Sequence, residues 1–333
     1  IQFFKNIIQM SKKAAFIKEL ALPVVAAPMF LISGPQLVIE CCKNGIVGTF
    51  PALNQRSTEG FEDWLVEIKT ELKKYEEETG KKAAPYGVNL IVHPTNPRLE
   101  ADLKVCIKHK VPLIITSLGA VSQLVNAIHS YGGLVFHDII KKRHAEKAAE
   151  AGADGLILVS AGAGGHAGTI NPMSLVAEIK KFYDKTILLS GCISTGRDIA
   201  SALQMGADLA YMGTRFINTK ESKASEEYRQ MIINAGASDV VYTAAISGVH
   251  ANFLGASLKA AGITEEDLKK DRKIDFGKEL NTEAKAWKTI WSAGQGVTTI
   301  NNVESVSELV ANLKSEFKSA IEDHIKILET YPK

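Results

Sequence analysis

Short apolar runs alternate with longer amphipathic stretches between residue 24 and about residue 235. Each run has the length of a buried parallel strand and is continuously apolar, which is typical of strands covered on both faces. Eight runs occur: Val24–Phe30, Gly45–Phe50, Tyr86–Val92, Leu113–Leu118, Leu134–Ile140, Gly155–Ala161, Ile187–Ile193 and Leu209–Phe216. Because eight β/α units close a barrel, the pattern predicts an α/β fold of the (β/α)8 TIM-barrel type.

The segments between the runs have the periodicity of helices, as in Phe61–Thr79 and Lys141–Ala151. Gly132, Gly152 and Gly206 each follow a predicted helix and precede a predicted strand, where a left-handed residue commonly ends a helix. An open, doubly wound sheet is the alternative architecture. It is disfavoured because no GxGxxG motif opens a first βα turn.

The alternation ends after Phe216, and residues 217–292 show helical stretches and loops. Val306–Tyr331 is amphipathic and is predicted to be a last helix that returns to the barrel. The sequence therefore predicts a barrel of residues 1–216 and 293–333 with a small helical lid domain of residues 217–292. Residues 1–9 lack the features of a targeting peptide, and we expect Met10 to be the native start.

Charge and cysteine content exclude several classes of partner. The formal net charge is +2, so we expect no nucleic-acid partner, and basic stretches such as 141–143 are interpreted as solvated helix faces. No apolar run is long enough to span a membrane. The four cysteines form no CxxC pair, and we expect reduced thiols, a cytoplasmic protein and no metal site.

The loop after the sixth run has the sequence SAGAGGHAGTI, from Ser160 to Ile170. Glycine allows backbone to approach a ligand closely, and active sites of TIM barrels lie at the carboxyl ends of the strands. We interpret this loop as one that lies against a flat ligand and presents His166 over it. A histidine in this place can act as a base near neutral pH. A flexible turn with a surface histidine is the plainer alternative.

The ends of the seventh and eighth runs predict a phosphate site. Gly191 and Cys192 precede a helix that starts near residue 195, and Gly213 and Thr214 stand in the corresponding place one strand later. Backbone N–H groups at a helix N-terminus bind phosphate, and these two loops are the recurring phosphate site of the fold. Two ordinary βα turns remain the alternative.

Other strand ends offer fewer signals. Asn89 is a polar residue in an apolar run, so if buried it must bond either backbone or a ligand. His137 and Asp138 are neighbours on one run, so we expect at most one of them to reach a pocket. The glycine-rich loop 291–297 is expected to cap a site.

Six segments in order resemble the nitronate monooxygenases, formerly called 2-nitropropane dioxygenases. They are AAPMF, GVNL, VFHDI, SAGAGGHAG, SGCISTGRDIASALQMGADLAYMGTRF and AWKTIWSAGQGV, and the resemblance extends from about Val24 to the C-terminus. It implies a barrel with a small helical lid, FMN bound without a covalent link, and oxidation of alkyl nitronates with O2.

The resemblance also implies roles for individual residues. His166 would be the catalytic base or would orient the substrate. The FMN phosphate would meet the backbone at the two phosphate loops, and Gln295 would close over the flavin. The remaining implied cofactor contacts are Ala27, Pro28, Met29, Asn89, Ser160, Gly164, Gly165, Gly191, Cys192, Gly213 and Thr214.

Two other functions stay open at the level of sequence. One is an NAD(P)H-dependent flavin reductase of the same fold, acting on a quinone or an enoyl thioester. The other is a flavin-free barrel that holds a sugar phosphate, which is disfavoured because no strand end presents a catalytic Lys or Glu clearly. The expected partners are a small-molecule substrate and O2, and the sequence leaves a homodimer open.

Overall fold

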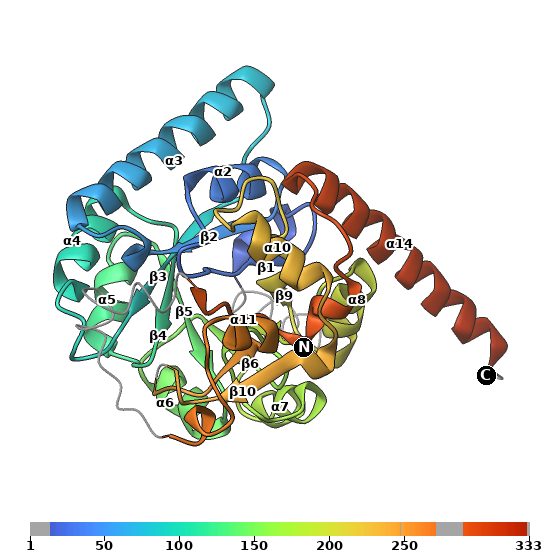
Figure 1. The fold of residues 1–333 in the computed structure, drawn as a ribbon. Helices are drawn as coiled ribbons and strands as arrows, with labels where there is room; N and C mark the ends of the chain where they lie inside the picture. Colours follow the sequence, from blue (N-terminus) through green and yellow to red (C-terminus); the bar gives the residue numbers. More distant parts are fainter. Residues whose placement is uncertain (1–13, 247, 271–288, 332–333) are drawn as a thin grey trace.

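The computed structural model describes residues 14–246, 248–270 and 289–331 (Figure 1). The expectation about Met10 falls outside these residues. Eight parallel strands form a closed barrel: β1 (Val24–Ala26), β2 (Val47–Pro51), β3 (Tyr86–Ile91), β4 (Leu113–Ser117), β5 (Leu134–Ile139), β6 (Gly155–Val159), β8 (Thr186–Ser190) and β9 (Leu209–Met212). The last strand pairs with the first, with Val25 opposite Tyr211. The predicted (β/α)8 TIM barrel and all eight predicted strands are confirmed.

Helices surround the barrel (Figure 1). They are α2 (Pro35–Lys43), α3 (Thr58–Thr79), α4 (Leu99–His109), α5 (Ser122–His129), α6 (Lys142–Glu150), α7 (Pro172–Ile179) and α8 (Gly196–Met205), with short 3-10 helices η1 (Ala15–Glu19) and η2 (Ala52–Asn54). Local sequence sets their ends: Thr195 and Asp198 form a capping box at the start of α8, and Gly206 ends it at φ 108°. Gly132 and Gly152 also have positive φ, as predicted.

The segment after β9 differs from the expected lid in one respect. Short helices α9 (Thr214–Ile217), α10 (Glu226–Ile233) and α11 (Gly255–Ala260) form, together with η3 (Ala237–Asp239) and η4 (Asp267–Lys269). However, β10 (Val240–Thr243) and β11 (Ala251–Leu254) are antiparallel strands, and β11 also pairs with β7 (Gly165–His166). The expectation of helices and loops alone is therefore wrong for these strands, because pairing with a distant loop decides their conformation. The domain boundaries stay a prediction.

The C-terminal segment ties the barrel wall to the region after β9. After η6 (Gln295–Thr299), helix α14 (Val306–Thr330) packs on α8 through Leu309, Val310 and Leu313. Its far half projects away from the barrel in Figure 1. The predicted last helix is confirmed, because its apolar stripe covers α8 and its polar face meets water.

Within the described residues, no helix is long and apolar enough to cross a membrane. In the same part of the chain, no three side chains of His, Cys, Asp or Glu lie together as a metal site would need. The four cysteines are free thiols. Three of them, Cys41, Cys42 and Cys106, are fully buried, and burial raises their pKa values, so they pack as small apolar residues.

Candidate functional site

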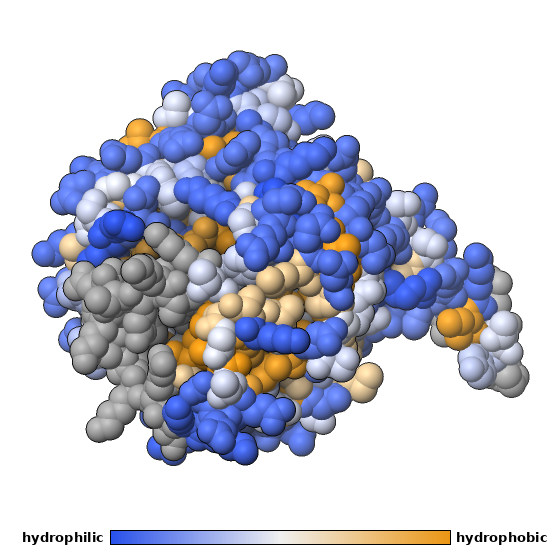
Figure 2. Space-filling model, in the orientation of Figure 1, coloured by the Kyte–Doolittle hydropathy of each residue, from blue (hydrophilic) through white to orange (hydrophobic). Residues whose placement is uncertain are grey.

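The carboxyl ends of the barrel strands open into a cavity of about 1100 Å³. The loops after seven of the eight barrel strands contribute to its walls, and Tyr242, residues 248–250 and residues from 290–296 also line it. Figure 2 shows apolar residues gathered in a hollow on this face, framed by hydrophilic ones. A large, mostly apolar cavity with a few polar groups is the usual form of a cofactor or substrate site.

Most of the predicted site residues meet at this cavity. Those that line it are Ala27, Pro28, Met29, Asn89, Gly164, Gly165, His166, Gly191, Cys192, Gly213 and Thr214. Two do not line it. Ser160 is fully buried, and its hydroxyl donates to the carbonyl of Ser190 at 2.7 Å, so it joins β6 to β8. Gln295 lies beside Cys192 and Gly162 and donates its N–H to the carbonyl of Gly162, while the neighbouring glycines line the cavity.

The loop after β8 has two consecutive residues with positive φ, a conformation that favours glycine. Gly191 has φ 127° and Cys192 has φ 57°. A Cβ on Gly191 would overlap the hydroxyl of Ser160 and lie 2.9 Å from the carbonyl oxygen of Ala161. No acceptor among the described residues takes the N–H groups of Gly191, Cys192 or Gly213. Open N–H donors at two neighbouring strand ends are groups that can bind an anion.

Gly191→Ala is expected to lower the free energy of unfolding by about 2–4 kcal/mol, because it adds left-handed strain to a clash with buried atoms. Urea titration measures the loss. Gly213→Ala is the matched control, since Gly213 has φ −105° and an added Cβ would lie 3.6 Å from its nearest neighbour. We expect the control to cost less than about 1 kcal/mol. Equal costs would contradict this account of the loop.

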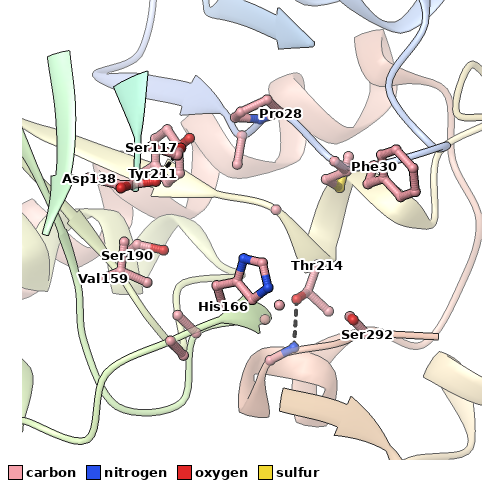
Figure 3. Close-up of a pocket in the computed structure, with 18 of the residues that line it drawn as sticks. Pro28, Phe30, Ser117, Asp138, Val159, His166, Ser190, Tyr211, Thr214 and Ser292 are labelled. Atoms are coloured by element: carbon pink, nitrogen blue, oxygen red, sulfur yellow. Dashed lines mark hydrogen bonds between the residues drawn. The ribbon is translucent and has the colours of Figure 1, made fainter. Parts of the chain in front are cut away.

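The loop after β9 is fixed by a contact to the capping segment. The N–H of Gly294 donates to the hydroxyl of Thr214 at 2.9 Å, the bond drawn beside Thr214 in Figure 3. Gly164 packs against the same place, where an added Cβ would lie 2.8 Å from the N atom of Gly294. The predicted capping role of loop 291–297 agrees with these contacts, because the loop closes one side of the cavity.

His166 projects into the cavity between the ends of β6 and β9 (Figure 3). Its strand β7 pairs with β11, where His166 lies opposite Ala251. The amide of Asn252 donates to the carbonyl of Ala163 at 2.7 Å and holds the same loop. The side chain is open to the cavity, yet surrounding protein atoms restrict its hydration and lower the pKa of His166 to about 4. At pH 7 the imidazole is therefore neutral and offers one N–H donor and one acceptor.

A chain of polar side chains crosses the floor of the cavity. The amide of Asn89 donates to the hydroxyl of Ser117 at 2.8 Å, and that hydroxyl donates to Asp138 at 2.5 Å. Figure 3 shows Ser117 and Asp138 together, with Tyr211 beside them. Asp138 is the one acid among the described residues that line the cavity. Burial raises its pKa to about 6, although Ser117 and the N–H of Leu118 partly offset that effect.

Asp138→Asn is expected to flatten the pH dependence of stability. The pKa of Asp138 is about 6 in the folded protein against an ordinary 3.8, so the folded state holds its proton more tightly. As the pH rises from about 4 to about 6, the free energy of unfolding of the wild type should therefore fall by roughly 2 kcal/mol more than that of the variant. Urea titrations of both proteins at pH 4, 5, 6 and 8 measure the difference. If the free energies of unfolding of the two proteins changed with pH in parallel, the pKa of Asp138 would not be raised in the folded state.

Several cavity residues were not predicted or were predicted wrongly. Asp138 and His137 both line the cavity, so the expectation of at most one is wrong: the cavity extends past the barrel end to the outer face of β5, where His137 lies. Tyr242 and Trp291 also line the cavity. Asp138 could have been found from its place at a strand end, because that position is where TIM barrels place their functional side chains.

Comparisons with known proteins agree with this geometry. The family model of nitronate monooxygenase matches residues 53–316. A nitronate monooxygenase of Paraburkholderia phytofirmans is 26% identical, over 90% of this chain and 93% of that protein. A (3aS,4S,5R,7aS)-5-hydroxy-7a-methyl-1-oxo-octahydro-1H-indene-4-carboxyl-CoA dehydrogenase of Rhodococcus jostii is 27% identical over 71% of this chain, and the match spans 63% of that relative.

A solved structure shows the same fold. The nitroalkane oxidase of Streptomyces ansochromogenes superposes with a TM-score of 0.79 at 23% identity, over 93% of this chain and all of that one. The family model covers most of the chain, and its residues include both phosphate loops, the His166 loop and the capping segment. The chain therefore belongs to the nitronate monooxygenase family and is a flavin-dependent oxidoreductase.

Proposed function

We propose that this protein binds FMN in the cavity and oxidises alkyl nitronates with O2. The observation that supports it most is the pair of loops after β8 and β9, whose open N–H groups at Gly191, Cys192 and Gly213 suit a phosphate. Thr214 adds a hydroxyl at the same place. The apolar wall formed by Ala27, Pro28 and Met29 suits a flat ring system.

A bound flavin would supply the acceptor for the substrate's electrons and their route to O2. The protein's part is to hold the two reactants together and to exclude water from them. The carboxyl-end position of the cavity places His166, the floor residue Asp138 and the phosphate loops around one space.

His166 is best suited to orienting the substrate. A nitronate already has its negative charge on the nitro oxygens, so its oxidation needs a hydrogen-bond donor rather than a base. The neutral imidazole of His166 provides an N–H donor at pH 7. A lowered pKa of about 4 makes it a weak base, so removal of the α-proton of a neutral nitroalkane should be slow.

A second function is an NAD(P)H-dependent flavin reductase with the same cofactor site. The size of the cavity favours it, because about 1100 Å³ exceeds the roughly 300–1,000 Å³ of most small-ligand sites. A relative named as a carboxyl-CoA dehydrogenase is consistent with a bulky substrate in this family of structures. A homodimer, cytoplasmic location and the absence of nucleic-acid partners stay predictions.

An anaerobic experiment separates the two functions. The purified protein, saturated with FMN, is mixed with propyl-2-nitronate and, in separate samples, with NADH or NADPH, while the visible flavin band is followed. Bleaching by the nitronate, with little by either nucleotide, supports the proposal. Bleaching by NADH or NADPH alone would replace it with the reductase.

A further inference from the structure

A second, smaller cavity lies outside the one described above. It is enclosed by the start of α8, the loop after β9, residues 299–304 and the first turns of α14, and α8 and α14 lie side by side in Figure 1. We call it the α8–α14 pocket. Among the described residues, Ser194 is the one that lines both cavities. The volume of the pocket is about 390 Å³, which is within the range of small-molecule sites, and the proposed function leaves it without a use.

Two buried hydrogen-bond donors in the wall of the pocket have no protein partner. Ser194 is 3% exposed and Arg215 is 6% exposed. Neither Oγ of Ser194 nor Nη1 of Arg215 bonds any described residue. The other terminal nitrogen of Arg215 bonds Asn302 and Glu304, which both line the pocket, so the guanidinium lies in its wall. Because buried donors are normally satisfied, these two groups favour a ligand with oxygen acceptors.

The charged side chains of the pocket disfavour a charged ligand. Arg215 is paired with Glu304, whose other oxygen accepts from the amide of Asn312 at 2.6 Å. Glu316 accepts from the N–H of Gly196 at 2.6 Å, at the start of α8, where the helix dipole favours an acid. An anion in the pocket would meet both carboxylates, and a cation would meet the guanidinium. The ligand that fits best is therefore electrically neutral.

The other side chains of the pocket suit a ligand rich in hydroxyl groups. The exposed residues at its mouth are amides and hydroxyls: Thr299, Asn301, Asn302, Asn312 and Ser315. Both kinds of group can donate and accept hydrogen bonds, as the hydroxyls of a ligand do. Leu309 and Leu313 of α14 add an apolar wall. A molecule with hydroxyls at its edges and C–H groups on its face matches both features.

We propose that the α8–α14 pocket binds a neutral polyhydroxylated molecule of monosaccharide size, whose hydroxyl oxygens accept from Ser194 and Arg215. Two kinds of molecule have this chemistry: a cyclic monosaccharide and an open-chain sugar alcohol. The site is separate from the cavity that holds His166, so the inference does not depend on the proposed function.

Saturation-transfer NMR titration of the full chain tests the pocket through binding rather than activity. D-glucose and sorbitol are the two neutral probes, and inorganic phosphate, followed by its 31P line width, is the charged one. The protein is first saturated with FMN, so that the larger cavity is occupied. We expect at least one of the neutral probes to bind with a dissociation constant of about 1 mM or tighter. Phosphate should not bind, because two carboxylates line the pocket.

Three variants locate the binding. Ser315→Phe places a large side chain at the mouth of the pocket and should weaken binding by about tenfold or more. Ser319→Phe is the matched control, because it makes the same change at an exposed position one turn further along α14, outside the pocket. It should leave binding unchanged. Ser194→Ala removes a hydroxyl that bonds no described residue, so the fold should be retained while binding weakens by about two- to tenfold.

The probe that binds identifies the kind of ligand: glucose alone indicates a cyclic sugar, sorbitol alone an open-chain one, and both together a polyol of either form. The inference would be overturned if neither bound, if phosphate bound in their place, or if Ser315→Phe and Ser319→Phe bound the probe equally well. Failure of the protein to take up FMN would instead contradict the proposed function. The comparison of these two variants would still test the α8–α14 pocket in that case, so the two failures are distinguishable.

Discussion

His166→Ala is expected to lower kcat for propyl-2-nitronate by about 10²-fold while FMN binding stays unchanged. Under the proposed function the variant removes the donor that would face the nitro oxygens, and loss of one preorganised donor typically costs about that much. It leaves the phosphate loops intact, because His166 touches neither Gly191 nor Gly213 through any hydrogen bond. Steady-state O2 consumption, with the bound FMN quantified from its absorbance, measures both quantities.

The control for this prediction is His324→Ala, an exposed histidine on the projecting part of α14. It should retain wild-type kcat. His166→Asn should recover part of the lost rate, since an amide provides an N–H donor without a titrating group. Wild-type turnover in His166→Ala would exclude His166 from the reaction.

Arg215→Met is expected to destabilise the fold by about 3–5 kcal/mol, because it leaves the carboxylate of Glu304 buried without its cation. Arg215 is 6% exposed and Glu304 is 8% exposed, and the two form a direct ion pair. The amide of Asn312 donates to the other oxygen of Glu304 at 2.6 Å. This pair joins the loop after β9 to the start of α14, so its loss should also weaken FMN binding.

Two further variants test that reasoning by urea titration. Lys220→Met breaks an exposed 3.3 Å pair with Glu308 and should cost less than about 1 kcal/mol. The double variant Arg215→Met, Glu304→Leu should recover much of the lost stability, because no unpaired charge then stays buried. A loss in Arg215→Met no larger than that in Lys220→Met would show that the buried pair is unimportant.

The barrel could be predicted from sequence because each of its strands is buried on both faces. A strand such as β6, Gly155–Val159, must be apolar throughout, and that pattern is visible without any partner. The turns at Gly191 and Gly213 could also be located, since glycine at these places in the fold marks close backbone approach. That they bind phosphate stays a prediction.

Features that depend on pairing across the chain were not visible in the sequence. β11 forms a strand because it pairs with β10 and with the His166 loop. Its residue Ala251 pairs with His166, which lies 85 positions earlier in the sequence. The Asn89–Ser117–Asp138 chain joins residues 28 and 21 positions apart.

We propose above all that the two loops after β8 and β9 hold FMN by its phosphate. Fluorescence titration of the flavin-free protein with FMN, and in parallel with riboflavin, tests it most directly, because the two ligands differ only in that phosphate. The account predicts one FMN per chain and riboflavin binding weaker by at least about 10²-fold, the value of a well-held phosphate. Equal affinity for the two flavins, or binding of neither, would contradict it.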